Sequence, residues 1–101
     1  MRGKRRYVVL KYMGGGEVSA GEVLNRVRAL LTNVFGLMGL IDTDPALVYS
    51  WEGRVFVVAV KREGLEKFLA SLVFDATHSI RVLKVVGTFR RAKRLVRSMQ
   101  K

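Results

Sequence analysis

The sequence predicts an α+β fold in which an antiparallel sheet carries two packing helices and a further basic helix follows at the C-terminal end. Short segments rich in β-branched residues are typical of strands. Longer segments with apolar residues every three or four positions are typical of helices. Their order along the chain is strand, helix, strand, strand, helix, strand and helix, which is the order of the split βαβ, or ferredoxin-like, sandwich.

The first strand is predicted at residues 7–12 (YVVLKY), after a basic arm formed by residues 1–6 (MRGKRR). Consecutive glycines at residues 14–16 end this strand in a turn. The glycine-rich segment lacks the Gly-Lys-Ser/Thr ending of a phosphate-binding loop. We therefore predict no nucleotide site there.

The first helix is predicted to begin after Ser19, because Ser19 and Glu22 fit the capping-box pattern. The apolar positions that follow at helical spacing are Val23, Leu24, Val27, Leu30, Leu31 and Val34. Residues 35–41 (FGLMGLI) are apolar but contain two glycines, which predicts an irregular helical turn over the core.

A turn at residues 42–45 (DTDP) precedes a predicted hairpin with strands at residues 47–51 and 54–61. The two acids of the turn lack the later acidic ligands of a calcium loop, so we predict no metal site. Residues 55–60 are all apolar, which predicts that the second hairpin strand is covered on both faces.

The second helix is predicted from apolar residues at helical spacing, namely Leu65, Phe68, Leu69, Leu72 and Val73. A polar connection at residues 75–79 follows and contains His78, the only histidine. The sequence shows no catalytic constellation of Cys, Ser or an acid that would include this histidine, so we expect it to be a surface residue.

The last strand and helix are predicted around residues 80–94 (IRVLKVVGTFRRAKR), where an apolar run ends at Gly87 and Thr88 and a run of cations begins. Thr88 is a favoured N-cap, which predicts a basic helix over residues 88–99. Its apolar face is expected to consist of Ala92, Leu95, Val96 and Met99. Free N–H groups and the positive dipole end at the helix start, followed by cations, suit a phosphate backbone. The alternative is a solvated helix whose charges only provide solubility.

The net charge of +11 is concentrated at the two ends of the chain. Residues 1–16 contain five basic residues and no acid, residues 17–75 contain six basic and eight acidic residues, and residues 76–101 contain eight basic residues and no acid. This asymmetry indicates binding to a polyanion. The predicted RNA-binding residues are Lys4, Arg5, Arg6, Lys84, Gly87, Thr88, Arg90, Arg91, Lys93, Arg94 and Arg97.

The chain is expected to form a single domain over residues 1–101, with a βαββαβ core at residues 7–86. The absence of cysteine excludes disulfides, thiolate metal sites and cysteine nucleophiles. No apolar run approaches the length of a membrane span and no signal-peptide core follows the basic start, so we expect a cytoplasmic protein without membrane contact. Few Asn and Gln residues, with more Arg than Lys, favour a thermophilic source.

Apolar surface beyond what two helices cover predicts self-association or a stable protein partner. The second face of the sheet has to be covered by the last helix or by another subunit. The residues expected at a protein interface are Phe35, Leu37, Met38, Leu40, Phe56 and Val58.

The predicted fold hosts many functions, so function has to be inferred from sites. RNA-recognition motifs stack bases on aromatic residues of the third strand, but residues 53–58 (GRVFVV) contain a single aromatic residue, so stacking on this sheet is not expected. An acylphosphatase-like enzyme needs an arginine loop with a positioned amide, and neither Asn25 nor Asn33 follows such a loop. A ribosomal or chromatin-type basic protein and a small-molecule-sensing module remain alternatives.

The chain resembles the archaeal and eukaryotic family of ribonuclease P protein component 2. The resemblance rests on Arg6 and Tyr7 followed by an aliphatic strand, on residues 82–94 (VLKVVGTFRRAKR), and on the matching order of the elements between them. Val86 is a departure, because the family usually has serine before its Gly-Thr pair.

The resemblance implies a non-catalytic subunit of the ribonucleoprotein that removes 5′ leaders from precursor tRNA, and in eukaryotes also of RNase MRP. The RNA and its bound Mg²⁺ perform the chemistry in that family, so no cofactor is expected on the protein itself. The implied partners are the catalytic domain of ribonuclease P RNA and a protein subunit of TIM-barrel type. A homodimer, or a heterotetramer of two such protein pairs, is also implied.

Overall fold

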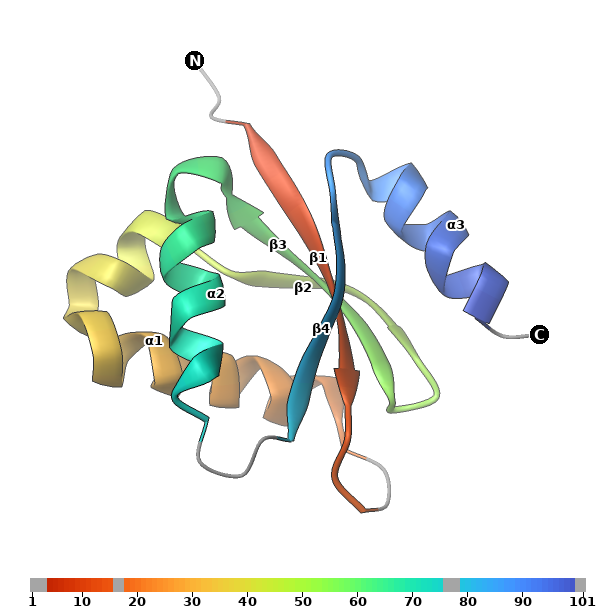
Figure 1. Ribbon diagram of the computed structural model, residues 1–101, viewed down its shortest axis with the longest axis horizontal. Coiled ribbons are helices and arrows are strands. Elements are labelled where there is room, and N and C mark those ends of the chain that lie inside the picture. The colour runs from red at the N-terminus through yellow and green to blue at the C-terminus, as the bar shows by residue number, and fades with distance from the viewer. Residues whose placement is uncertain (1–3, 16–17, 76–78, 100–101) are drawn as a thin grey trace.

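The computed structural model describes residues 4–15, 18–75 and 79–99 and confirms the ferredoxin-like α+β fold. Four antiparallel strands form a sheet in the order β2-β3-β1-β4 (Figure 1). The strands are β1 (Arg5–Tyr12), β2 (Ala46–Trp51), β3 (Val55–Lys61) and β4 (Ile80–Val86). Because β1 begins at Arg5 rather than at Tyr7, Arg5 and Arg6 belong to the sheet and not to the predicted arm. Residues 1–3 of that arm lie outside the described residues.

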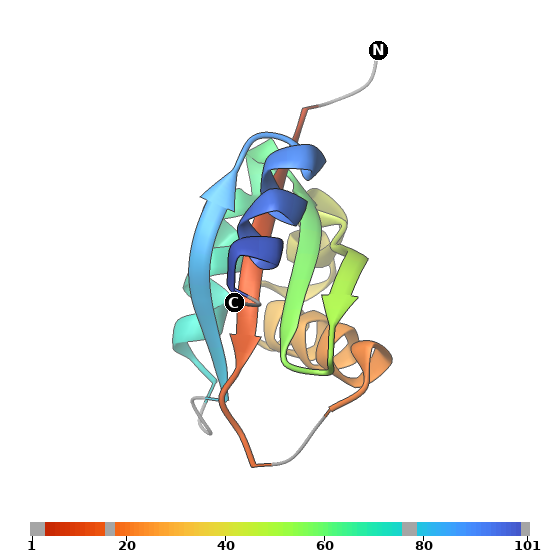
Figure 2. The ribbon, with the colours of Figure 1, turned by 90° about the vertical axis from the view of Figure 1, so that its right-hand side faces the viewer.

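The helices lie on both faces of the sheet (Figure 2). They are α1 (Ala20–Thr43), the short 3₁₀ helix η1 (Arg62–Gly64), α2 (Leu65–Val73) and α3 (Phe89–Met99). The first two α-helices cover one face, whereas α3 packs alone on the other (Figures 1 and 2). The sheet is therefore the middle layer of three, and its second face is covered by the chain's own last helix.

Helix α1 begins and bends where the sequence predicts it. The Ser19 hydroxyl accepts a hydrogen bond from the backbone N–H of Glu22 at 3.2 Å and caps the first turn. Gly36 interrupts the helical backbone with φ 73°, a conformation that glycine adopts without steric cost. The segment after this kink continues as helix to Thr43, which confirms the predicted irregular helical turn.

Strand β3 is buried on both faces, as its uninterrupted apolar run predicts. Val58 and Val60 pack with residues of α1 and α2, while Val55 and Val57 pack with residues of α3. The prediction that Phe56 and Val58 contact another protein is therefore wrong. Phe56 is 1% exposed and Val58 is 0% exposed, because the fold's own helices and the segment around Val18 and Val23 cover them.

Strand β2 contains a bulge at Val48 that changes the face on which the following residues lie. Leu47 pairs with Val58, whereas Tyr49 pairs with Val57. Directly opposed residues on neighbouring strands point to the same face, so Leu47 faces α1 and Tyr49 faces α3. In a regular strand two residues that are two positions apart would share a face.

A second bulge, at Leu83, has the same effect in β4. Val9 of β1 pairs with Lys84 and the next residue, Leu10, pairs with Val82, which leaves Leu83 without a partner of its own. Leu83 packs with the residues under α3, and Lys84 lies on the same face because it is opposite Val9. The bulge thus brings two consecutive side chains, one apolar and one cationic, to the face that carries α3.

Gly64 allows the end of α1 to approach the start of α2. The Thr43 hydroxyl, which is fully buried, donates a hydrogen bond to the Gly64 carbonyl at 3.4 Å. A Cβ atom at Gly64 would lie 2.6 Å from Thr43 Cα and 2.7 Å from the Asp42 carbonyl oxygen. Both are backbone atoms, so a larger residue requires the two helices to separate.

We expect the Gly64→Ala substitution to lower the free energy of unfolding by about 1–3 kcal/mol, the usual cost of overpacking a core contact. Gly21→Ala is the matched control, because no atom of the described residues outside its own helical turn lies within 4 Å of a Cβ atom at that position. Alanine there should be neutral or stabilising by up to about 1 kcal/mol. Denaturant unfolding measures both variants. Equal effects at the two glycines would contradict the proposed close approach.

Candidate nucleic-acid interface

Two exposed residues, Gly87 and Thr88, connect the end of β4 to the start of α3. The Thr88 hydroxyl accepts a hydrogen bond from the backbone N–H of Arg91 at 3.2 Å, and the Thr88 carbonyl accepts one from Ala92 at 3.2 Å. Thr88 is therefore the N-cap that the sequence predicts. Apart from the neighbouring residues of the chain, no atom of the described residues lies within 4 Å of a Cβ atom placed at Gly87, so the surface beside this helix start is open.

The two sides of α3 differ sharply in character. Ala92 and Val96 are fully buried against the sheet, and Leu95 is half-buried beside them. The opposite side carries the cations Arg90, Arg91, Lys93, Arg94 and Arg97, all exposed except the half-buried Lys93. The apolar side fixes the rotation of the helix, and this rotation turns the cations outward.

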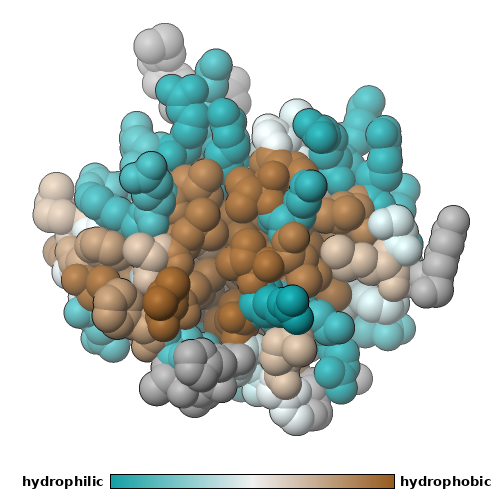
Figure 3. Space-filling model, viewed as in Figure 1, coloured by the Kyte–Doolittle hydropathy of each residue, from teal (hydrophilic) through white to brown (hydrophobic). Residues whose placement is uncertain are grey.

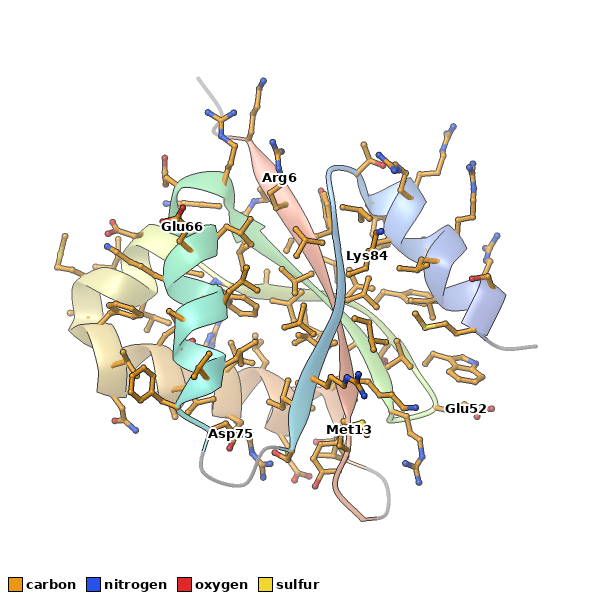
Figure 4. All side chains as sticks on the ribbon, viewed as in Figure 1. Arg6, Met13, Glu52, Glu66, Asp75 and Lys84 are labelled. Carbon is orange, nitrogen blue, oxygen red and sulfur yellow. The ribbon has the colours of Figure 1, made fainter. Side chains whose placement is uncertain are left out.

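Lys84 joins the cations of α3 through the bulge in β4. It lines a surface hollow together with Arg91, Arg94, Val86, Leu95 and Ser98. A second hollow, which shares Arg94 with the first, is lined by Phe89, Arg90, Lys93, Arg94 and Arg97. Figure 4 shows Lys84 on β4 beside α3. The structure thus brings the predicted cations of β4 and α3 into one surface, which we call the basic face.

The three predicted cations near the start of the chain differ in their surroundings. Lys4 is exposed. Arg5 forms an ion pair with Asp44 at 3.0 Å and donates a further hydrogen bond to the Asp44 carbonyl oxygen at 3.3 Å. Arg6, at the start of β1 (Figure 4), is half-buried and donates to the Arg5 carbonyl oxygen at 3.2 Å. Arg5 is therefore already partly neutralised, unlike the cations of α3.

The acidic side chains that form ion pairs lie away from the basic face. Of the ion pairs in the described part of the chain, one joins Arg5 to Asp44 and the other joins Lys67 to Asp42 at 2.8 Å. Both therefore involve the end of α1, and Glu66 on α2 lies across the sheet from α3 (Figure 4). No cation of α3 has a carboxylate partner among the described residues. The basic face is thus available to an external anion.

An aromatic cluster lies at the start of α3 and was not predicted from the sequence. The ring centroid of Phe89 is 6.0 Å from that of Tyr7 in β1 and 6.4 Å from that of Tyr49 in β2. Lys93 Nζ lies 5.4 Å from the Phe89 centroid and 5.8 Å from the Tyr49 centroid. Strand alternation places Tyr7 on the same face as Val9, so the position of Tyr7 could have been found from the sequence. The bulge that turns Tyr49 toward α3 has no clear sequence signature.

The apolar surface expected to contact protein is only partly present. Phe35, Leu37 and Met38 are 37%, 66% and 64% exposed, whereas Leu40 is half-buried and packs on the core. Ile41, in the same predicted apolar segment, is 51% exposed. The other large exposed apolar residues of the described chain, which sequence reasoning missed, are Met13, Val48, Val73, Phe74, Phe89 and Met99. Figure 3 shows a further apolar surface over β4, between α2 and α3. A shallow hollow there is lined by Met13, Leu69, Leu72, Val73, Ile80, Arg81 and Val82.

The described residues contain no group of three or more His, Asp and Glu side chains that could hold a metal ion. Asp42 and Asp44, the two acids of the predicted turn, instead form the ion pairs with Lys67 and Arg5. His78 lies outside the described residues. No helix in the described ranges has both the length and the apolar character that a membrane span needs.

Comparison with known proteins agrees with the resemblance seen in the sequence. The model of the Rpp14/Pop5 family matches residues 6–97. A protein from Methanocaldococcus jannaschii named ribonuclease P protein component 2 is 30% identical over 98 residues, which is 92% of this chain and 72% of that protein. A protein of the same name from Methanococcus aeolicus is 26% identical over the same lengths and shares of the two chains. Because the family match spans all strands and helices from β1 to α3 except their outermost residues, the chain belongs to the Rpp14/Pop5 family.

Proposed function

We propose that this chain is a protein subunit of ribonuclease P and that its basic face binds the RNA of that enzyme. The observation that carries the proposal is the basic face itself. Lys84, Arg91 and Arg94 line one hollow that has no acidic residue among its described lining residues. The relatives of the chain are named ribonuclease P protein component 2. A basic ribosomal or chromatin-type protein is the alternative function, and the family match does not favour it.

The geometry of the basic face suits phosphates better than base edges. Cations on successive turns of α3 follow the helix axis, and the exposed helix start at Gly87 and Thr88 offers backbone N–H groups and the positive end of the dipole. Such contacts position a protein on RNA without reading its sequence. Aromatic stacking on the open sheet, as in RNA-recognition motifs, is blocked here because α3 covers that face.

In this proposal the chain assists cleavage and does not perform it. The RNA, with its bound Mg²⁺, removes the 5′ leader of precursor tRNA, and the protein itself binds no cofactor. The protein contributes counter-charge that allows the anionic RNA and its substrate to approach each other. We place this reaction in the cytoplasm.

The exposed part of α1 after its kink is proposed as the contact for a protein subunit of TIM-barrel type. Leu37 and Met38 are the most exposed large apolar residues of α1, at 66% and 64%. The kink at Gly36 separates them from the buried stripe of the first half of the helix. A homodimer, or a heterotetramer of two such protein pairs, would bury this surface in the assembled enzyme.

The first test of RNA binding is charge reversal on α3. Because counterions are released when phosphates are neutralised, the logarithm of affinity should fall with the logarithm of salt concentration by about 0.7–0.9 per phosphate contact. The Arg90→Glu/Arg91→Glu variant should weaken binding to ribonuclease P RNA and flatten this slope. Affinity titrations at several salt concentrations measure both quantities.

Two controls accompany this titration. Arg28→Glu/Arg62→Glu changes the net charge equally at exposed positions outside the basic face and should leave the slope nearly unchanged. Thr88→Ala removes the N-cap, should cost about 1 kcal/mol of stability, and should affect the slope less than the charge reversal does. If the α3 and control reversals have equal effects, the basic face is only a solvated surface.

The second test is reconstitution of precursor tRNA cleavage. Adding the protein to ribonuclease P RNA together with its other protein subunits should raise the cleavage rate at limiting Mg²⁺. The protein alone should be inert at any Mg²⁺ concentration, and the α3 charge reversal should lose the stimulation that the control reversal retains. Cleavage by protein from which all RNA has been removed would contradict a non-catalytic role.

The third test concerns the protein partner. Leu37→Glu/Met38→Glu places charges on the exposed part of α1 and should weaken binding to the TIM-barrel subunit, because a desolvated interface does not accommodate unpaired carboxylates. Val73→Glu, at a position on α2 that is 75% exposed, is the control. Light scattering of the mixed subunits measures the complex. Loss of the complex only in the Val73 variant would place the interface on α2 instead.

A further inference from the structure

Phe89 differs from the other apolar residues that hold α3 on the sheet. Ala92 and Val96 are 0% exposed, whereas Phe89 is 36% exposed at the first position of the helix. Its ring is nevertheless held in place, because it contacts the rings of Tyr7 and Tyr49 at 6.0 and 6.4 Å between centroids. The result is an aromatic ring that is held by two tyrosine rings and still has about a third of its surface exposed.

Phe89 lines a hollow whose other described lining residues are all cations, namely Arg90, Lys93, Arg94 and Arg97. The positions of these side chains follow from helix geometry, since residues three or four apart are neighbours on a helix surface. Lys93 Nζ is 5.4 Å from the Phe89 centroid and has no carboxylate partner among the described residues. Its ammonium group lies over the ring and, because no carboxylate holds it there, it can turn away from the ring toward a bound phosphate.

A planar aromatic ring among cations matches the two chemical parts of a nucleotide. The base stacks on the ring, and the phosphates on either side pair with the cations. Phosphates alone would need only the cations, and an apolar peptide would leave four of the five lining residues without a counter-charge. In a duplex each base is already stacked on its neighbours, so the matching ligand is an unpaired nucleotide in a loop, bulge or end.

We propose that Phe89 is a stacking site for one unpaired nucleotide of the bound RNA, with Arg90, Lys93, Arg94 and Arg97 contacting the adjacent phosphates. This inference rests on the proposed function, because it assumes that the basic face binds RNA. It adds that the basic face selects RNA with an unpaired nucleotide. The basic face then distinguishes an RNA with an unpaired base from a fully paired one, which phosphate contacts alone cannot do.

The competing role for Phe89 is that of a structural anchor for α3 on Tyr7 and Tyr49. Leucine would fill this role approximately, because it preserves most of the apolar contact, but it has no π-face on which a base can stack. Tyrosine preserves both the contact and the stacking surface. The pair Phe89→Leu and Phe89→Tyr therefore separates stacking from anchoring. Phe35→Leu is the matched control, because Phe35 is exposed to almost the same degree, 37%, on the opposite side of the sheet.

The experiment uses an RNA hairpin with one bulged nucleotide, the same hairpin with an abasic residue at the bulge, and a fully paired hairpin. Fluorescence anisotropy gives the affinity of each protein for each RNA. Wild-type protein should bind the bulged hairpin more tightly than the abasic one by about 5- to 150-fold, the range expected for one stacked base. Phe89→Leu should lose this preference, while Phe89→Tyr and Phe35→Leu should keep it.

Salt dependence separates failure of this inference from failure of the proposed function. Phe89→Leu should keep the salt slope of the wild type, because it removes no phosphate contact. Wild-type protein that binds all three hairpins equally, with a steep salt slope, would overturn the stacking site and leave RNA binding intact. Absence of salt-dependent binding to any RNA would overturn both. Circular dichroism would show whether Phe89→Leu unfolds α3. In that case the affinities of wild-type protein for the bulged and abasic hairpins still test whether a base stacks on the protein.

Discussion

The structure depends on the burial of its two central strands, β1 and β3, on both faces. Residues of β3 alternate between the core under α1 and α2 and the core under α3, and six consecutive positions are buried as a result. Helices α1 and α2 cover only one face of this sheet, so the other face has to be covered by a further helix or by another subunit. Helix α3 meets this requirement with Ala92 and Val96, which have no exposed surface. The position of the basic face therefore follows from the packing of the core.

The two β-bulges adapt a regular sheet to the third helix. Each bulge lies in an edge strand, one at Val48 and the other at Leu83, where an extra residue disturbs few hydrogen bonds. The first turns Tyr49 toward α3, and the second places Lys84 beside the helix. An aromatic ring and a cation of the edge strands thus lie on the face that carries α3, although Leu47 and Val82, two positions before them, lie on the other face.

Much of this arrangement could be predicted because the patterns that determine it are local. The Thr88 cap, the periodicity of α3 and the apolar run of β3 each depend on a few neighbouring residues, and the structure agrees with all three. Phe56 and Val58 were assigned wrongly because the sequence shows that a residue is apolar but not what covers it. The aromatic cluster was missed because it depends on the bulge in β2, and a bulge is a property of strand pairing rather than of the strand alone.

The helix that is proposed to bind RNA is also the helix that completes the hydrophobic core. Detaching α3 would expose Val9, Val57 and the other apolar residues of the second face, at a cost of about 25 cal/mol for each Å² of apolar surface. The cations of α3 therefore do not belong to a tail that folds onto RNA, and binding need not offset the conformational entropy of ordering the helix. Only the side chains lose freedom on binding. To select one RNA geometry over another, a protein needs cations in fixed positions, and α3 holds its cations in a fixed position relative to the aromatic ring at its start. A flexible basic tail would instead bind any polyanion.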